Sequence, residues 1–200
     1  MKIIGITGPT GAGKGTLCIE LEKLGYPCID TDAISKLVVK PGSECLAELR
    51  KNFGDEIIDQ NGELIRKKLA DIAFSDEKKH LLLNFVTHKY ITEQVHAKIE
   101  FFRSKNFAAC VIDAPLLFES RENELCDITV GVIADKKLRE KRIIKRDNLE
   151  ESDAKKRMLA QKDDSFYIEK CDYIVYNNDS KEVFSDFAEK LHALIKTDCK

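Results

Sequence analysis

The residues with the clearest chemical meaning lie in a glycine-rich stretch near the start of the chain, Gly8-Pro9-Thr10-Gly11-Ala12-Gly13-Lys14-Gly15-Thr16. The stretch has the spacing GxxxxGK and stands between an apolar run and a helical pattern. Glycines let backbone N–H groups turn inward around phosphate oxygens, and the N-terminus of the following helix adds partial positive charge. Lys14 supplies a full positive charge for β- and γ-phosphates. The stretch therefore predicts a nucleoside triphosphate site, formed by Gly8, Gly11, Ala12, Gly13, Lys14, Gly15 and Thr16.

Gly15 stands where the usual pattern has Ser or Thr directly after the lysine. The Gly-Lys-Gly-Thr form resembles adenylate-kinase-like enzymes, in which the Thr after the Gly serves the metal. This resemblance assigns Thr16 to Mg²⁺. The alternative is a glycine-rich turn that binds nothing, and the combination of strand, spacing, lysine and helix argues against it.

Carboxylates follow two of the apolar runs. Asp113 ends the run 108–112, where a carboxylate beside a phosphate loop holds Mg²⁺ through water; alternatively, it caps the next turn. Asp30 ends the run 27–30 and Asp32 follows it two residues later, and ligands of open parallel sheets bind at the carboxyl ends of the strands. A carboxylate there can accept a proton from a substrate hydroxyl. The alternative, that Asp32 caps a helix starting at Ala33, remains open on spacing alone.

Residues 136–157 are dense in Lys and Arg interleaved with acids. Arg142 and Arg146 are four residues apart and share one face of a helix. Such a helix is usually a solvated surface. In an enzyme that transfers phosphate, however, an arginine on a mobile lid neutralises charge that develops on the transferred group.

The order of the predicted elements favours an α/β fold. Apolar runs typical of buried strands cover residues 2–7, 27–30, 107–113, 127–134 and 172–176. Helical patterns cover residues 14–24, 32–39, 44–52, 135–147, 152–162 and 180–195, and a long one capped by Ser75 runs to about Phe102. Strands separated by helices imply a parallel sheet covered on both faces. The helix-rich block from about 44 to 104 has no strand pattern and indicates an insertion.

Composition excludes several classes of protein. The chain has 200 residues, of which 43% are hydrophobic and 34% charged, which fits one globular domain with a small insertion. No apolar run is long enough for a membrane span, and the N-terminus lacks a signal-peptide pattern. A net charge of -2 gives no support to nucleic-acid binding. Seven cysteines without CxxC spacing argue against a disulfide framework or a zinc site, and predict reduced thiols in the cytoplasm.

Together these motifs resemble the dephospho-CoA kinase family, which uses ATP to phosphorylate the ribose 3′-hydroxyl of dephospho-CoA. The resemblance spans nearly the whole chain. It is carried by the phosphate loop, Ile29-Asp30-Thr31-Asp32, His88, Pro115-Leu116-Leu117-Phe118-Glu119, Arg142, Arg146-Asp147, Arg157-Met158, Gln161, Asp172-Tyr173-Ile174 and Asn177.

The resemblance implies a three-layer α/β/α P-loop NTPase fold with a parallel five-stranded sheet, a helical CoA domain and a lid. It implies one kinase domain over residues 1–200, with a core at about 1–40, 105–135 and 170–200. The helical substrate subdomain falls at about 41–104 and the lid at about 136–165. The implied reaction is the last step of coenzyme A biosynthesis, in the cytoplasm, with ATP and Mg²⁺. We expect no nucleic acid, membrane or obligate protein partner.

Roles carry over by position. The catalytic residues are Asp32, as general base for the 3′-hydroxyl, with Lys14 and Arg142 at the phosphates. Besides the loop, ATP meets Arg142 and, near the adenine, Asn177. The residues implied to bind dephospho-CoA are Asp32, His88, Leu116, Leu117, Phe118 and Glu119. The metal is implied to meet Thr16 and, through water, Asp113.

The chain departs from the family pattern at three positions. Gly15 replaces Ser, Lys89 replaces Pro after His88, and Asp163 replaces a small residue after Gln161. None of these removes a charged group that the reaction needs. By itself, His88 is more simply a surface or packing residue on a long helix.

Two other functions are alternatives to this kinase. A nucleoside or nucleoside-monophosphate kinase of the same fold is favoured by Gly-Lys-Gly-Thr and opposed by Pro-Leu-Leu-Phe-Glu. A nucleotide-dependent switch would be supported by a guanine-reading Asn-Lys-x-Asp motif, which the sequence lacks.

Overall fold

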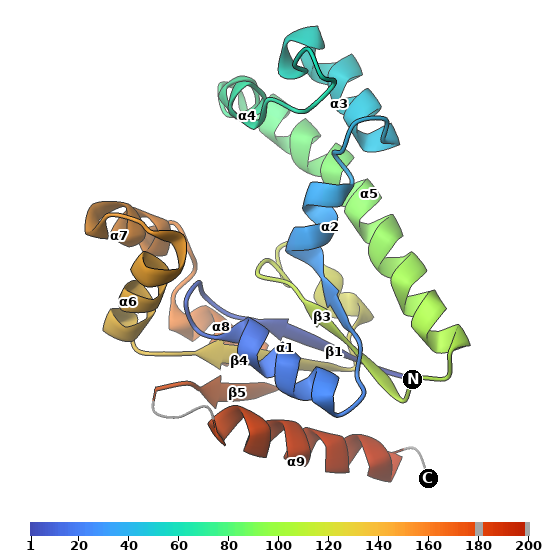
Figure 1. Cartoon of the computed structure of the whole chain (residues 1–200), viewed down its shortest axis with the longest axis vertical. Helices are drawn as coiled ribbons and strands as arrows, with labels where there is room; N and C mark the ends of the chain where they lie inside the picture. Colours follow the sequence, from blue (N-terminus) through green and yellow to red (C-terminus); the bar gives the residue numbers. More distant parts are fainter. Residues whose placement is uncertain (179–181, 199–200) are drawn as a thin grey trace. The chain divides into compact units, whose positions relative to one another are not determined.

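The structure is a computed structural model that describes residues 1–178 and 182–198. Its centre is a five-stranded parallel sheet in the order β2-β3-β1-β4-β5 (Figure 1). The strands are β1 (Lys2–Thr7), β2 (Cys28–Asp30), β3 (Ala109–Asp113), β4 (Ile128–Ile133) and β5 (Tyr173–Tyr176). β1 lies between β3 and β4, so the loop that follows it leaves the middle of the sheet.

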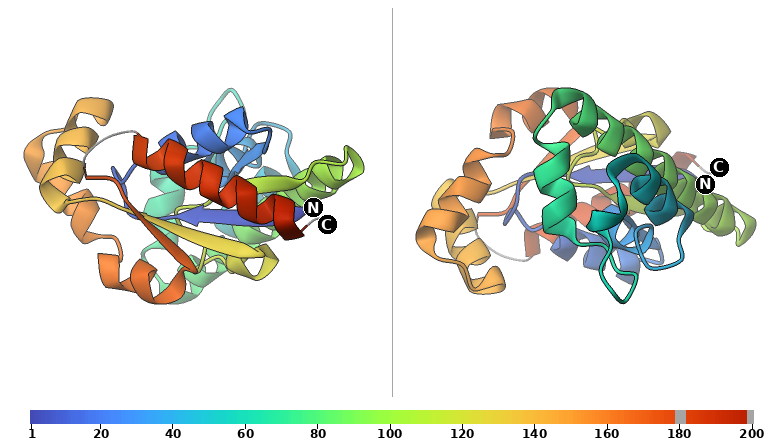
Figure 2. Two further views of the ribbon diagram at one scale, coloured as in Figure 1. Left: turned by 90° about the horizontal axis from the view of Figure 1, so that it is seen from below. Right: turned by 90° about the horizontal axis from the view of Figure 1, so that it is seen from above.

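One face of the sheet packs against α1 (Lys14–Lys23) and α9 (Glu182–Asp198), which lie side by side in Figures 1 and 2. Ile4 and Ile6 are two residues apart, face the same side, and join Leu17 of α1 and Phe184 of α9 in one buried cluster. Burial of each such side chain contributes about 1.5–3 kcal/mol. This cluster fixes α1, and therefore the loop before it, on the sheet.

The opposite face is built around two glycines. A Cβ on Gly5 would come within 2.7 Å of the Cys126 sulfur and 2.9 Å of Leu117. A Cβ on Gly131 would come within 2.7 Å of Ile174. The segment after β3 and the helix α8 (Asp164–Lys170), which contacts β4 and β5, therefore lie close to the strands. Between β4 and α8 the chain forms α6 (Lys136–Asp147) and α7 (Glu151–Leu159).

The chain divides into two compact units, one of Met1–Ile29 with Phe101–Lys200 and one of Asp30–Glu100. The second unit contains α2 (Thr31–Leu37), α3 (Glu44–Phe53), α4 (Arg66–Ala73) and most of α5 (Glu77–Ser104). α3 and α4 contact each other and the 3₁₀ turn η1 (Asp55–Ile57). Buried Leu49, Ile57 and Leu69 form part of the apolar interior here.

The fold class and the five strands predicted from the sequence are confirmed, with bounds that shift by one or two residues. Ser75 is not the cap of the long helix. Its hydroxyl donates to the Ile72 carbonyl, whereas Asp76 accepts from the Lys78 N–H at the start of α5. α4 and α8 were not predicted, and the expected start of the last helix at Ser180 lies outside the described residues.

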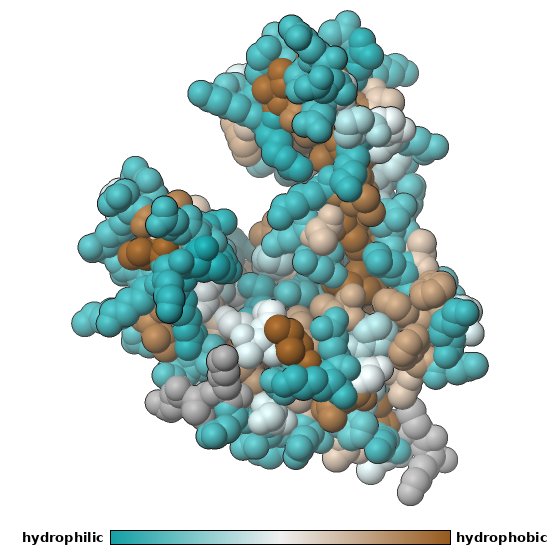
Figure 3. Space-filling view, in the orientation of Figure 1, coloured by the Kyte–Doolittle hydropathy of each residue, from teal (hydrophilic) through white to brown (hydrophobic). Residues whose placement is uncertain are grey.

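Most side chains on the face drawn in Figure 3 are hydrophilic. Within the described ranges, no helix combines the length and the apolar character needed to cross a membrane.

Candidate active site

The loop between β1 and α1 adopts a backbone that requires glycine. Gly13, directly before α1, has φ 108°, a region that disfavours side chains. A Cβ there would also lie 2.4 Å from Asn177 Nδ2 and 3.1 Å from the Phe184 ring. At Gly8, a Cβ would lie 2.2 Å from the Val132 carbonyl oxygen. The loop is therefore pressed against β4 and the segment after β5.

Donors from distant segments hold the carbonyl groups of this loop. Asn177 Nδ2 donates to the Ala12 carbonyl at 2.6 Å, and Lys14 Nζ donates to the Gly8 carbonyl at 2.9 Å. Arg142 Nη1 donates to the Gly11 carbonyl at 3.3 Å. These hydrogen bonds fix the carbonyl groups of the loop. The loop leads directly into α1, and the N-terminus of a helix carries partial positive charge, which suits an anion.

Arg142 also forms a hydrogen bond with Asn177. Arg142 Nη2 donates to the Asn177 carbonyl at 3.2 Å, and the Asn177 N–H donates to the Ile133 carbonyl at 2.7 Å. Asn177 is 7% exposed, so its carboxamide is a buried polar group satisfied by the loop. Both residues predicted for the ATP site therefore contact the phosphate loop or its support.

The two residues that the sequence predicts for Mg²⁺ lie near the loop between β1 and α1. Asp113 is the last residue of β3 and pairs in register with Ile6, two residues before Gly8. Thr16 lies in the first turn of α1, half-buried. A hydrogen bond with Cys28, burial, and the neighbouring Asp113 together raise the pKa of the Cys18 thiol, so the carboxylate lies close to α1. Hydroxyl and carboxylate oxygens are the ligands that Mg²⁺ prefers.

The segment Leu116–Glu119 presents two kinds of side chain. Leu116 is 57% exposed, whereas Leu117 is fully buried against Gly5 and supports the segment from beneath. The Phe118 ring packs edge-on against Phe166 of α8, with 5.9 Å between ring centroids. Glu119 is exposed. The pKa of Tyr167 is raised to about 12, first by burial of Tyr167 and second by the negative charge of Glu119.

In the second unit, Asp30 at the end of β2 and Asp32 at the start of α2 have different roles. Asp30 is the N-cap of α2, and its carboxylate accepts from the Ala33 N–H at 2.9 Å. Asp32 lies in the first turn of α2, exposed, and its carboxylate has no hydrogen-bond partner in the described part of the chain. The sequence left open whether Asp32 caps a helix that starts at Ala33; in the structure α2 starts at Thr31 and its cap is Asp30.

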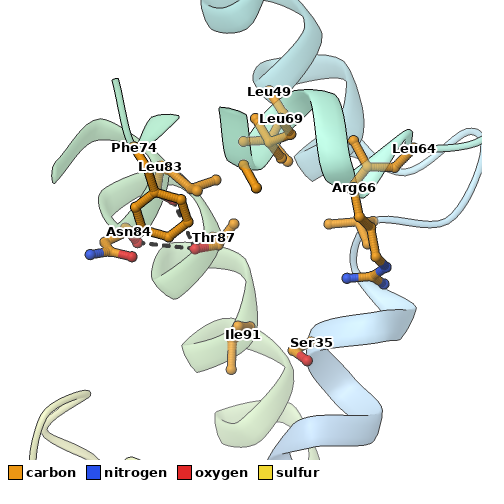
Figure 4. A pocket seen from close by; sticks show the side chains of 12 residues that line it. Ser35, Leu49, Leu64, Arg66, Leu69, Phe74, Leu83, Asn84, Thr87 and Ile91 are labelled. Carbon is orange, nitrogen blue, oxygen red and sulfur yellow. Dashed lines mark hydrogen bonds between the residues drawn. The ribbon is translucent and has the colours of Figure 1, made fainter. Parts of the chain in front are cut away.

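The second unit also contains a pocket of about 280 Å³ (Figure 4). Arg66 and Asn84 stand on opposite sides of it, and Ser35 of α2 reaches its edge. The lining is Ser35, Val39, Leu49, Leu64, Arg66, Leu69, Ala70, Phe74, Leu83, Asn84, Thr87 and Ile91. His88 is half-buried on α5, next to the lining residue Thr87 but not itself part of the lining. The walls combine apolar side chains with a few polar groups, as ligand sites commonly do.

Comparison with known proteins decides between the kinases that share this loop. The family model for dephospho-CoA kinases matches residues 2–182. The chain belongs to the dephospho-CoA kinase family. It is 37% identical to the dephospho-CoA kinase of Corynebacterium diphtheriae, over 96% of each chain. The members of this family phosphorylate dephospho-CoA with ATP, the final step of CoA biosynthesis.

Solved structures agree with this assignment. The structure of TT1252 from Thermus thermophilus has a TM-score of 0.81 at 27% identity, over 96% of both chains. A dephospho-CoA kinase from Campylobacter jejuni has a TM-score of 0.70 at 25% identity, over the full length of both. In this kinase, ATP is therefore the phosphoryl donor and dephospho-CoA the acceptor.

Two contacts of the kinase were not predicted. Gln161 appeared in the sequence as part of a motif without a role, yet its Oε1 accepts from the Thr10 N–H at 2.8 Å. Arg139 is buried on α6, where its Nη2 lies 3.4 Å from Asp164 Oδ1. Its backbone packs closely against Gly11, where an added Cβ would lie 2.8 Å from the Arg139 carbonyl oxygen. No local pattern signals either contact, because each joins segments far apart in the sequence.

Proposed function

We propose that Asp32 is the general base of this dephospho-CoA kinase. Its carboxylate accepts the proton of the ribose 3′-hydroxyl while the hydroxyl oxygen attacks the γ-phosphorus of ATP. One observation carries this proposal. Asp30, the last residue of β2, caps α2, so the exposed carboxylate of Asp32 is not needed for the cap. The strands are parallel, so the chain leaves β1 and β2 at the same edge of the sheet.

The phosphates of ATP are assigned to the N-terminus of α1 and to Lys14. Support comes from the glycine-dependent backbone at Gly13, which leaves no room for a side chain where the loop turns into the helix. The positive charge of Arg142 is also assigned to these phosphates, while its hydrogen bonds hold the Gly11 and Asn177 carbonyls. Asn177 belongs to the same support.

Mg²⁺ is assigned to Thr16 and, through water, to Asp113. The oxygen donors at the ends of β3 and of the loop fit this ion. When bound, Mg²⁺ neutralises phosphate charge. Chelation with EDTA should abolish turnover, and added Mg²⁺ should restore it. Full turnover in EDTA would remove the metal from the proposal.

The arm of dephospho-CoA is assigned to the pocket of the second unit. This arm combines methylenes with amides, and the pocket pairs apolar walls with Arg66, Asn84 and Thr87. Ser35 is one turn, about 4.5 Å of rise, beyond Asp32 on α2, so the pocket and the proposed base are on one helix. His88 and the segment Leu116–Glu119 stay predicted acceptor contacts.

The test of the base compares Asp32→Asn with Asp30→Asn. Loss of a general base lowers turnover by roughly 10²–10⁴-fold, so D32N should lose kcat while the KM for ATP stays unchanged. D30N should keep most of the turnover and of the stability, because the Asn oxygen can still accept from the Ala33 N–H and cap α2. Equal losses of kcat and ATP affinity in D32N, or no loss, would contradict the assignment.

The same assay checks acceptor choice. ADP release should rise with dephospho-CoA and not with AMP, and a response to AMP would favour a nucleotide kinase. We also propose that the enzyme works in the cytoplasm. We propose further that it needs no obligate protein partner, which turnover by the purified chain alone would support.

A further inference from the structure

Gln161 lies in the short segment 160–163 that joins α7 to α8. It follows α7, and its N–H donates to the Met158 carbonyl at 3.2 Å. Two residues later, Asp163 caps α8 by accepting from the Phe166 N–H at 3.3 Å. The backbone at Gln161 is therefore held between the ends of two helices.

The hydrogen bond between Gln161 and the phosphate loop runs in the opposite direction to those of Arg142 and Asn177. Arg142 and Asn177 donate to carbonyls of the loop, whereas Gln161 Oε1 accepts from a loop N–H, that of Thr10, at 2.8 Å. The two residues are 151 positions apart, and both are half-buried. A backbone N–H that lost this acceptor would have to rotate or bind water, because buried donors need partners.

The segment that carries Gln161 also reaches the acceptor side. Phe166 packs on Phe118, and Lys170 Nζ lies 5.6 Å from the Phe118 ring centroid. The segment 160–163 and α8 thus contact the phosphate loop at one end and the Leu116–Glu119 segment at the other. All of these residues belong to the first compact unit.

We propose that Gln161 is a positioning residue of the nucleotide site. Its carboxamide oxygen orients the Thr10 N–H and so holds the first turn of the loop in the shape that receives the phosphates of ATP. This inference rests on the proposed ATP site in the loop. Gln161 acts through Thr10, so its loss affects ATP affinity more than the chemical step or the binding of dephospho-CoA.

Gln161→Met tests the contact, because Met has nearly the same size but lacks the acceptor oxygen. The KM for ATP should rise about three- to tenfold, the effect of one neutral hydrogen bond. The KM for dephospho-CoA should stay unchanged, and the melting temperature should fall by no more than about 2–4 °C. Gln94→Met is the matched control, since Gln94 is exposed on α5, and all its constants should equal those of the unchanged chain.

Hydrogen–deuterium exchange of segment 8–16 gives a readout that a general loss of stability would not reproduce. The Thr10 amide should exchange faster in Q161M and stay protected in Gln161→Glu, whose carboxylate still accepts. An ATP KM within twofold of the unchanged chain, unchanged exchange, or parallel changes in both KM values and melting temperature would overturn the proposal.

Lys14→Met separates this proposal from the ATP site on which it rests. A large loss of ATP affinity in K14M together with normal Q161M overturns only the role of Gln161. Normal ATP affinity in K14M overturns the site itself.

Discussion

Arg142 and Asn177 form one support behind the phosphate loop. The guanidinium donates to the Asn177 carbonyl at 3.2 Å, while the Asn177 carboxamide donates to Ala12 at 2.6 Å and the guanidinium reaches Gly11 at 3.3 Å. α6 and the segment after β5 thus hold consecutive carbonyls of the loop. The sequence predicted both residues for ATP, and the contacts found here are with the loop that is proposed to bind its phosphates.

Replacing Asn177 by Asp tests the direction of the buried bond. The carboxylate oxygen of N177D cannot donate and would face the Ala12 carbonyl. We expect an ATP KM at least tenfold higher and a loss of about 1–3 kcal/mol in the free energy of unfolding. Urea unfolding and steady-state kinetics measure both.

Asn178→Asp is the control for that change. Asn178 Oδ1 accepts from the Asp135 N–H, and a carboxylate retains this acceptor. Near-normal kinetics in N177D would show that the Ala12 contact is dispensable.

Arg142→Ala removes the donors to three carbonyls, those of Gly11, Ala12 and Asn177, and a positive charge beside the loop. Hydrogen bonds from charged groups contribute about 1.5–3 kcal/mol, so kcat/KM for ATP should fall by at least tenfold. Arg142→Lys should recover part of the loss through its charge. Lys141→Ala, on the exposed side of α6, should have no effect; equal losses in K141A and R142A would point to the net charge of the helix instead.

Gly13 and Gly15 provide a matched pair for alanine substitution. Gly13→Ala should abolish ATP binding, because φ is 108° and the new Cβ would lie 2.4 Å from Asn177 Nδ2. Gly15→Ala should be tolerated, since nothing lies within 4 Å of a Cβ there and the residue is in the first turn of α1. Nucleotide titration calorimetry measures the difference, and tight binding by G13A would contradict the described loop.

The half-buried thiols should resist alkylation. Burial raises the pKa of Cys126 and of Cys171 to about 12, so both stay protonated at pH 8. A rise from the usual pKa of a thiol lowers the thiolate fraction roughly a thousandfold. Iodoacetamide at pH 8 should therefore modify them slowly, and faster as the pH rises. Mass spectrometry of the native chain and of the chain in guanidinium chloride gives the comparison; equal rates would refute the shift.

Much of this architecture was predictable because its signals are local. The apolar runs that became β1, β3 and β4 alternate with helical patterns, and the loop 8–16 has a spacing that a strand and a helix must flank. α8 was missed, although Asp163 three residues before Phe166 is the pattern of a helix cap. Ser75 was predicted to cap the long helix, but Asp76 provides the acceptor instead, since neighbouring polar residues compete for the same N–H groups.

The sequence by itself determined the strands, most helices and the phosphate loop, since backbone hydrogen bonding and hydrophobic periodicity act over a few residues. The tertiary structure decided which polar groups are free for chemistry and which hold the scaffold. Asp30 caps α2 and leaves Asp32 exposed, while Gln161 meets Thr10, and Arg142 meets Asn177, across long stretches of chain. These pairings depend on how the sheet and its helices pack, because a hydrogen bond requires two atoms within about 3 Å and the sequence does not specify that distance.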